Sequence, residues 1–168
     1  EKTADMLGTN AYHGGFVCYR DGHLHPLNLC IGEARAAHEQ GVKIYEQSPV
    51  AEIVHGNRPR VVTADGHVDA DAVILAGNAY SRLEPKHLSN LVFPAGSYII
   101  ATEPLPENVA ESINRKDVAV CDLNEVVDYY RLSADRRLLY GGACNYSGRD
   151  PKSIKSSILP RMLKVYPH

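Results

Sequence analysis

The chain has 168 residues, a formal net charge of -2 at pH 7 and 44% hydrophobic residues. This length suits one domain or two small ones and is sufficient to bury a real core. The small negative charge argues against nucleic acid as the main partner, and no apolar run has the length of a membrane span. No signal peptide pattern is present and the first residue is Glu1, so we expect the chain to begin inside a longer protein.

The cysteines and histidines form no recognisable metal site or disulfide framework. The four cysteines contain no C-x-x-C pair, and without a secretory signal this predicts buried free thiols in a cytoplasmic protein. His13, His23 and His25 match no common zinc spacing, so no metal is expected there. The cysteines are Cys18, Cys30, Cys121 and Cys144.

The N-terminal segment predicts a short helix followed by a strand. Residues 1–7 read as helical turns that Gly8 caps, because glycine tolerates the left-handed conformation found at helix ends. Asn10 to Tyr19 mixes β-forming residues with Gly14 and Gly15, which indicates a strand with a bulge or a close backbone approach.

The next segment predicts a helix and two strands. Pro26 suits the first turn of a helix, whose apolar residues share one face and which Gly41 ends. Val42 to Tyr45 and Val50 to Val54 then read as short strands. This helix–strand order is typical of an α/β unit with parallel strands.

A hairpin and a buried strand follow. Arg60 to Ala64 and His67 to Asp69 flank Asp65-Gly66, which is a strong hairpin signal. Val73 to Ala76 is a continuous apolar run, which favours a strand of a parallel sheet that is covered on both faces. Tyr80 to Leu83 predicts one helical turn. Small residues directly after the run would let a ligand approach the backbone closely.

The second half predicts mainly antiparallel strands joined by hairpins. Two strands bracket a polar loop at residues 134–137, and a helix that begins at Pro151 closes the chain. The predicted strands are Ser97–Ala101, Val118–Cys121, Tyr129–Leu132 and Leu138–Tyr140, with a short helix over Glu107–Ile113.

The ordered set of these segments resembles the FAD-dependent amine and amino-acid oxidoreductases of the D-amino-acid oxidase type. Within that family it is most similar to the members that act on a gamma-glutamylated putrescine. The resemblance covers nearly the whole chain. The segments are Tyr12-His-Gly-Gly15, Gly-Val-x-Ile at 41–44, Asp-Gly-x-Val-x-Ala-Asp at 65–71, Val73-Ile-Leu-Ala76, Tyr98-Ile-Ile-Ala101, and Arg136-Arg-Leu-Leu-Tyr-Gly-Gly142.

The resemblance implies a mixed α/β fold built from two parts. Residues 25–83 would be part of a FAD-binding domain with a parallel sheet, and residues 1–24 and 92–150 would form a mainly antiparallel substrate-binding domain. Residues 151–168 would start a C-terminal helix. The family's G-x-G-x-x-G loop, which holds the FAD pyrophosphate, is absent from these residues, so we expect this fragment alone not to retain FAD and to self-associate through exposed apolar surface.

The resemblance also implies which residues contact ligands. The cofactor-binding candidates are Val50, Ala76, Gly77 and Asn78, where Asn78 stands at a position that is often glycine in the family. The candidates for binding the small-molecule amine substrate are His13, Tyr98, Tyr130 and Arg131. Arg131 would pair with the glutamyl carboxylate, or would simply lie on a solvated strand face; His13 would lie near the flavin, or would be a packed histidine.

The implied reaction is oxidation of a primary amine by the flavin, followed by hydrolysis of the imine to an aldehyde and ammonia and by reduction of oxygen to hydrogen peroxide. Two other functions stay open from the residues alone. One is a related dehydrogenase that passes its electrons to another acceptor, and the other is a non-catalytic interaction domain.

Overall fold

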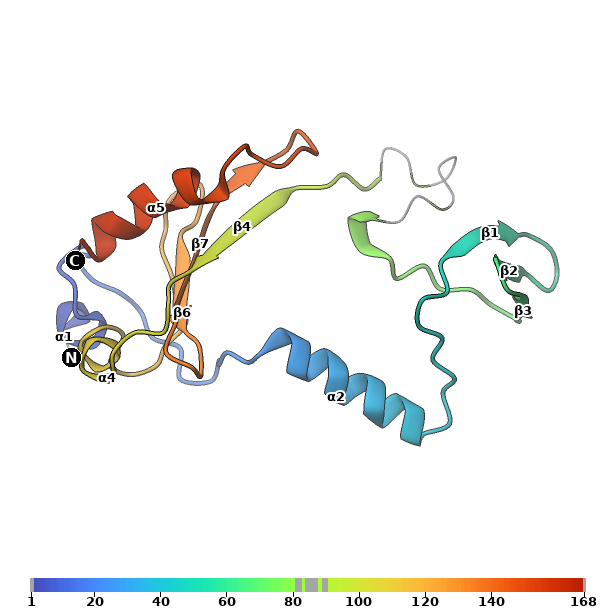
Figure 1. Cartoon of the computed structure of the whole chain (residues 1–168), viewed down its shortest axis with the longest axis horizontal. Helices are drawn as coiled ribbons and strands as arrows, with labels where there is room; N and C mark the ends of the chain where they lie inside the picture. Colours follow the sequence, from blue (N-terminus) through green and yellow to red (C-terminus); the bar gives the residue numbers. More distant parts are fainter. Residues whose placement is uncertain (1, 81–82, 84–87, 89–90, 168) are drawn as a thin grey trace. The chain divides into compact units, whose positions relative to one another are not determined.

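The computed structural model describes residues 2–80, 83, 88 and 91–167 of the chain. The chain divides into two compact units (Figure 1). Unit 1 contains Glu1–Leu24 and Ala95–His168, and unit 2 contains His25–Pro94. The four-stranded sheet of unit 1 and the three-stranded sheet of unit 2 are both antiparallel throughout.

Unit 1 is built on a four-stranded sheet with the strand order β4-β7-β6-β5. The hairpin predicted around residues 134–137 is confirmed, and its second strand is longer than expected because pairing with β4 continues to Asn145. The helix α5 (Ile154–Val165) packs against β4 and β7. Ser153 caps α5, since its hydroxyl accepts a hydrogen bond from the Ser156 backbone N–H. The strands are β4 (Gly96–Ala101), β5 (Val120–Cys121), β6 (Tyr129–Leu132) and β7 (Leu138–Asn145).

The core of unit 1 lies between the sheet and α5 and is rich in tyrosine. Tyr130 and Tyr140 pair across β6 and β7, are 2% and 0% exposed, and stack with ring centroids 5.3 Å apart. Tyr166 meets the Tyr130 ring edge-on at 5.7 Å. Ile158 from α5 is also fully buried in this cluster. Aromatic pairs in these geometries add to the stabilisation from burial alone.

The beginning and the end of unit 1 are joined by two hydrogen bonds. The helix α1 (Thr3–Leu7) ends at Gly8, whose φ of 65° confirms the predicted cap. The Tyr166 hydroxyl donates to the Leu7 carbonyl at 2.7 Å, and the Thr9 hydroxyl donates to the Val165 carbonyl at 2.6 Å. Figure 1 shows the N-terminal segment beside the C-terminal end of α5.

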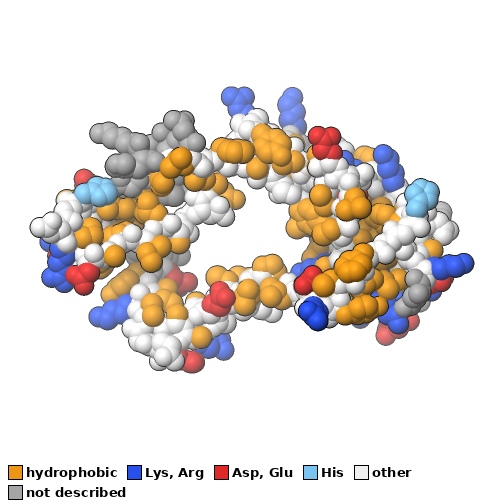
Figure 2. All heavy atoms as spheres, turned by 180° about the vertical axis from the view of Figure 1, so that it is seen from behind, with side chains coloured by type: hydrophobic (Ala, Val, Ile, Leu, Met, Phe, Trp, Pro, Cys, Tyr) orange, Lys and Arg blue, Asp and Glu red, His pale blue; other side chains and the backbone are white. Residues whose placement is uncertain are grey.

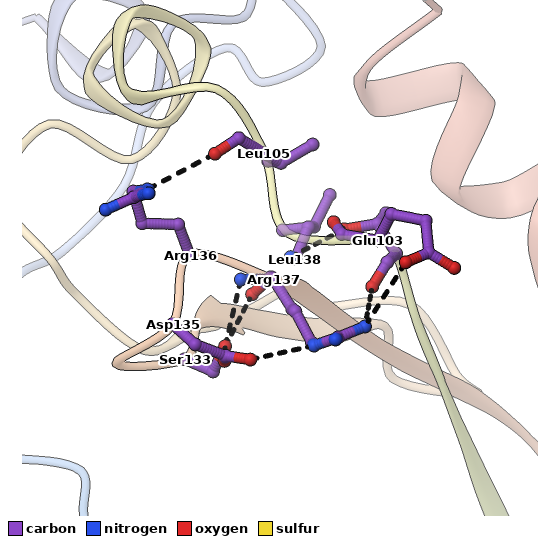
Figure 3. A network of polar contacts seen from close by, with 8 residues as sticks. Glu103, Leu105, Ser133, Asp135, Arg136, Arg137 and Leu138 are labelled. Atoms are coloured by element: carbon purple, nitrogen blue, oxygen red, sulfur yellow. Dashed lines mark hydrogen bonds and ion pairs between the residues drawn. The ribbon is translucent and has the colours of Figure 1, made fainter.

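A polar network holds the β6–β7 turn against the segment that follows β4 (Figure 3). Arg137 donates from Nε to Asp135 at 2.8 Å and from Nη1 to the Thr102 carbonyl at 3.0 Å. Arg136 donates to the Leu105 carbonyl at 3.2 Å. The chain after Leu105 forms α4 (Glu107–Ser112), as predicted.

Unit 2 contains a helix and a three-stranded sheet. The helix α2 (Pro26–Glu39) begins and ends close to the predicted positions, but it contains no buried residue. The hairpin prediction is confirmed, with pairing between β1 and β2 and between β2 and β3. The strands are β1 (Val50–Val54), β2 (Arg60–Thr63) and β3 (His67–Asp69), and η1 (Asn78–Tyr80) is a short 3-10 helix.

Three predicted strands are wrong, and with them the parallel sheet. Val73 to Ala76, Val42 to Tyr45 and Asn10 to Tyr19 run outside any sheet, and Ile74 is 89% exposed. A parallel strand needs neighbours from distant parts of the sequence. The described residues of unit 2 offer only the local β1–β2–β3 hairpins. The helical turn predicted at residues 80–83 overlaps η1 at Tyr80, and residues 81 and 82 lie outside the described residues.

The thiol prediction is correct in one respect and wrong in another. All four cysteines are free, but all are exposed rather than buried. Cys30 lies on α2, which has no buried face, and Cys121 lies on the edge strand β5.

Figure 2 shows many hydrophobic side chains (orange) at the surface of the chain. No helix among the described residues combines the length and the apolar character that crossing a bilayer requires.

Candidate functional site

The four-stranded sheet of unit 1 has one face that α5 does not cover. Successive side chains of a strand point to opposite faces, so the residues that alternate with Tyr130 and Tyr140 share the other face. Tyr129, Gly141 and Ile99 are paired across β6, β7 and β4 in one row of this face. Ile99 is 55% exposed although it lies in a strand interior. We call this surface the open face.

Tyr129 is held in a fixed position on the open face. Its hydroxyl is hydrogen-bonded to the Ser97 hydroxyl at 2.9 Å, which spans from β6 across β7 to β4. Its ring lies directly over Gly141, where a Cβ atom would overlap the ring. Gly141 is therefore required for this approach, and it leaves an aromatic surface with a hydroxyl at one end.

Arg131 follows Tyr129 by two residues and belongs to the same face of β6. The side chain is partly buried. Nη1 donates to the Leu132 carbonyl and Nη2 donates to the Leu24 carbonyl, each at 3.2 Å. Both acceptors are uncharged. Arg131 thus brings a cation to the same face of β6 as Tyr129.

The other predicted substrate residues lie elsewhere. Tyr130 is in the core beneath α5, and burial strongly raises the pKa of its phenol. Tyr98 packs against the same core from β4, and its hydroxyl donates to Asp150 at 3.3 Å. Burial, and then the nearby Asp150 charge, raise the pKa of Tyr98. His13 is exposed in an irregular segment. The structure does not bring these three side chains together with Arg131.

Tyr129 and Ser97 were missed by the sequence prediction. The signal that identifies Tyr129 was present, because the period of two in a strand places residues 129 and 131 on one face and residue 130 on the other. Tyr130 and Arg131 are successive residues of β6, so their side chains lie on opposite faces of the sheet and are not expected to contact the same ligand. The contact between Ser97 and Tyr129 depends on the β4–β7–β6 order, which no local pattern reveals.

The cofactor-binding candidates lie in unit 2. Val50 begins β1, at an irregularity of the β1–β2 pairing, and is partly buried. Ala76 and Gly77 are exposed, and Asn78 has a φ of 51° with its side-chain oxygen accepting from the Ala79 N–H at 2.7 Å. No backbone N–H from Val73 to Gly77 donates to another backbone group among the described residues. Small side chains and free backbone groups suit contacts with a ribose or a phosphate.

The described part of the chain contains no group of three His, Cys, Asp or Glu side chains arranged to hold a metal ion. A partly buried ion pair lies behind the open face: Arg161 of α5 donates from Nε to Asp128 at 2.5 Å and from Nη2 to the Val126 carbonyl at 2.8 Å. The adjacent Asp128 carboxylate raises the pKa of Arg161. This pair ties α5 to the residue that precedes Tyr129.

Comparison with known families decides the chain's relationship. The family with the short name DAO, described as FAD dependent oxidoreductase, matches residues 1–168. The chain belongs to this family. Proteins of the family are FAD-dependent, and the resemblance seen in the sequence motifs is confirmed.

Curated relatives match nearly all of this family member. Gamma-glutamylputrescine oxidoreductase of Escherichia coli (strain K12) is 44% identical over 163 residues, which are 96% of this chain and 38% of that protein. The "probable oxidoreductase OrdL" of Haemophilus influenzae is 43% identical over 99% of this chain and 39% of its own length. The protein of the same name from Rhizobium meliloti is 35% identical, with the same coverage of both chains. The chain thus spans about two fifths of these relatives.

A solved structure supports the fold. The crystal structure of glycine oxidase from Geobacillus kaustophilus matches with a TM-score of 0.59 and 20% identity, covering 83% of this chain and 37% of that chain. At this identity the match shows a shared fold alone. It supports a mixed α/β arrangement with antiparallel sheets for this family member.

Proposed function

We propose that the protein containing this chain is an FAD-dependent enzyme that oxidises the primary amine of gamma-glutamylputrescine. The products would be an aldehyde, ammonia and hydrogen peroxide. The observation that carries the proposal is the 44% identity over 96% of this chain to the Escherichia coli enzyme whose name states that substrate. A cytoplasmic location belongs to the same proposal.

The open face of unit 1 supports this assignment because its chemistry suits a polyamine derivative. The Tyr129 ring and the Ile99 side chain offer apolar surface for the methylene groups of the substrate. The hydroxyls of Tyr129 and Ser97 offer hydrogen-bonding groups that can orient a polar end. FAD, when bound, supplies the electron acceptor for the amine, while these residues hold the substrate in position.

The FAD contacts of unit 2 are part of the proposal. Val50 would contact the adenine end through its backbone, and Ala76, Gly77 and Asn78 would face the ribose or the pyrophosphate. The exposed backbone of residues 76–77 and the positive φ of Asn78 support this assignment. Contacts of this kind need free backbone groups and little side-chain bulk, and both are present in this segment.

The test is to purify the full-length protein and supply gamma-glutamylputrescine in air. We expect a flavin absorbance spectrum, bleaching of that spectrum by the substrate without oxygen, and equal amounts of ammonia and hydrogen peroxide with oxygen present. Ammonia without peroxide would identify a dehydrogenase that uses another acceptor. A protein without flavin that turns over no amine would favour a non-catalytic interaction domain and refute the proposal.

A further inference from the structure

Three arginines among the described residues are partly buried, and they differ in what their guanidinium groups contact. Arg161 is paired with Asp128 at 2.5 Å, and Arg137 with Asp135 at 2.8 Å. Arg131 has no carboxylate partner among the described residues, and its two hydrogen bonds go to backbone carbonyls. The charges of the first two are therefore balanced within the chain, and the charge of Arg131 is not.

The hydrogen-bonding capacity of Arg131 is also incompletely used. A guanidinium group has five N–H donors in a fixed planar arrangement, and one donor each of Nη1 and Nη2 is engaged. The two carbonyl contacts fix the orientation of the group, so the remaining donors are already held in place. A preoriented guanidinium that lacks a counter-ion matches the two oxygens of a carboxylate.

The position of Arg131 indicates which carboxylate it meets. It shares the open face with Tyr129, and residues two apart on one face of a strand are neighbouring positions. We propose that Arg131 binds the carboxylate at the end of the substrate remote from the reacting amine, and so selects glutamylated amines over simple ones. This inference rests on the proposed function. It makes Arg131 a specificity-determining residue.

The competing explanation is that Arg131 has only a structural role, in which its hydrogen bond to the Leu24 carbonyl holds that segment in place. The two explanations differ in their dependence on the substrate. A lost anchor disturbs the turnover of every amine, whereas a lost carboxylate contact disturbs only substrates that carry the carboxylate. Comparing gamma-glutamylputrescine with 4-aminobutanoylputrescine, which differs by removal of that carboxylate alone, therefore separates them.

The experiment compares wild-type full-length holoenzyme with Arg131→Met and Arg131→Lys. The control is Arg136→Met, since Arg136 is an exposed arginine that also donates to a backbone carbonyl. We expect Arg131→Met to lower kcat/KM for gamma-glutamylputrescine by about 10- to 100-fold, mainly through KM. The value for 4-aminobutanoylputrescine and the flavin content should stay unchanged, the lysine variant should be intermediate, and the control should match wild type.

An equal loss on both substrates, a loss of flavin, or no loss at all would overturn the inference. If the wild-type protein oxidises neither compound, the proposed function fails, and equilibrium dialysis of gamma-glutamylputrescine then tests Arg131 separately. At least tenfold weaker binding to Arg131→Met would support the carboxylate contact. Equal binding to the variant and the wild type would refute it.

Discussion

Replacing Arg161 by methionine is expected to destabilise unit 1 strongly, because it removes the counter-ion of a carboxylate that water barely reaches. The Asp128 side chain is 10% exposed, and Arg161 Nε lies 2.5 Å from its Oδ1. Breaking a buried pair by removing one partner costs about 3–5 kcal/mol. The residual exposure of Asp128 places the expected loss near the lower end, at about 3 kcal/mol.

The matched control is Arg137→Met, which breaks a pair of similar length in a more exposed place. The side chains of Arg137 and Asp135 are 37% and 61% exposed, so the expected loss is about 1 kcal/mol or less. Removing both charges with Arg161→Met and Asp128→Ala together should cost less than Arg161→Met alone, since no unpaired carboxylate remains buried.

Urea unfolding followed by near-ultraviolet circular dichroism measures these losses. The chain has no tryptophan, and three tyrosines pack together in the unit 1 core, so the tyrosine signal reports that core. A loss of about 3 kcal/mol lowers the urea midpoint by about 1 M or more. Equal shifts for Arg161→Met and Arg137→Met, or a double variant less stable than Arg161→Met, would refute the reasoning.

Three further predictions concern the cofactor segment and the tyrosine core. In the full-length protein, Asn78→Val should lower flavin content and Asn78→Gly should preserve it, because the φ of 51° suits valine poorly; equal content would remove Asn78 from the cofactor contacts. Tyr166→Phe should lower the free energy of unfolding by about 1 kcal/mol, because it removes the hydrogen bond from the Tyr166 hydroxyl to the Leu7 carbonyl. Burial raises the pKa of Tyr166 from 10.0 to about 12, so its contribution to stability should be complete below pH 10 and lost as the pH rises to 12; thermal unfolding that is insensitive to pH in this window would contradict this.

The elements that the sequence predicted correctly are those specified by neighbouring residues. Asp65-Gly66 determines its own hairpin, and Pro26 and Gly41 mark the limits of α2 without reference to the rest of the chain. The parallel sheet was wrong because pairing of parallel strands depends on segments distant in sequence. An apolar run such as Val73 to Ala76 indicates that these side chains are suited to burial. It does not indicate which part of the protein would cover them.

The candidate site was predictable to a similar extent. Arg131 was predicted from the family resemblance, and the structure places it on the open face beside Tyr129 in the strand. Tyr130 was also predicted from the resemblance, although strand alternation places it on the opposite face from Arg131 and places Tyr129 on the same face. The hydrogen bond between Ser97 and Tyr129 joins residues on strands that are two places apart in the sheet, so it becomes visible only when the strand order is known.

The two hydrogen bonds that join the ends of unit 1 have a consequence for how the protein folds during synthesis. The bonded pairs Leu7–Tyr166 and Thr9–Val165 are separated by 159 and 156 positions. Closing so long a loop is entropically costly and slow compared with forming local hairpins. Unit 2 is one continuous segment, residues 25–94, that is synthesised before β4. Its local hairpin can therefore form before the sheet of unit 1 is complete. The first α-helix can dock earlier on residues 114 and 115, whose backbone N–H groups donate to the carbonyls of Leu7 and Met6, but its bond to the last helix forms only after residue 166 has been translated.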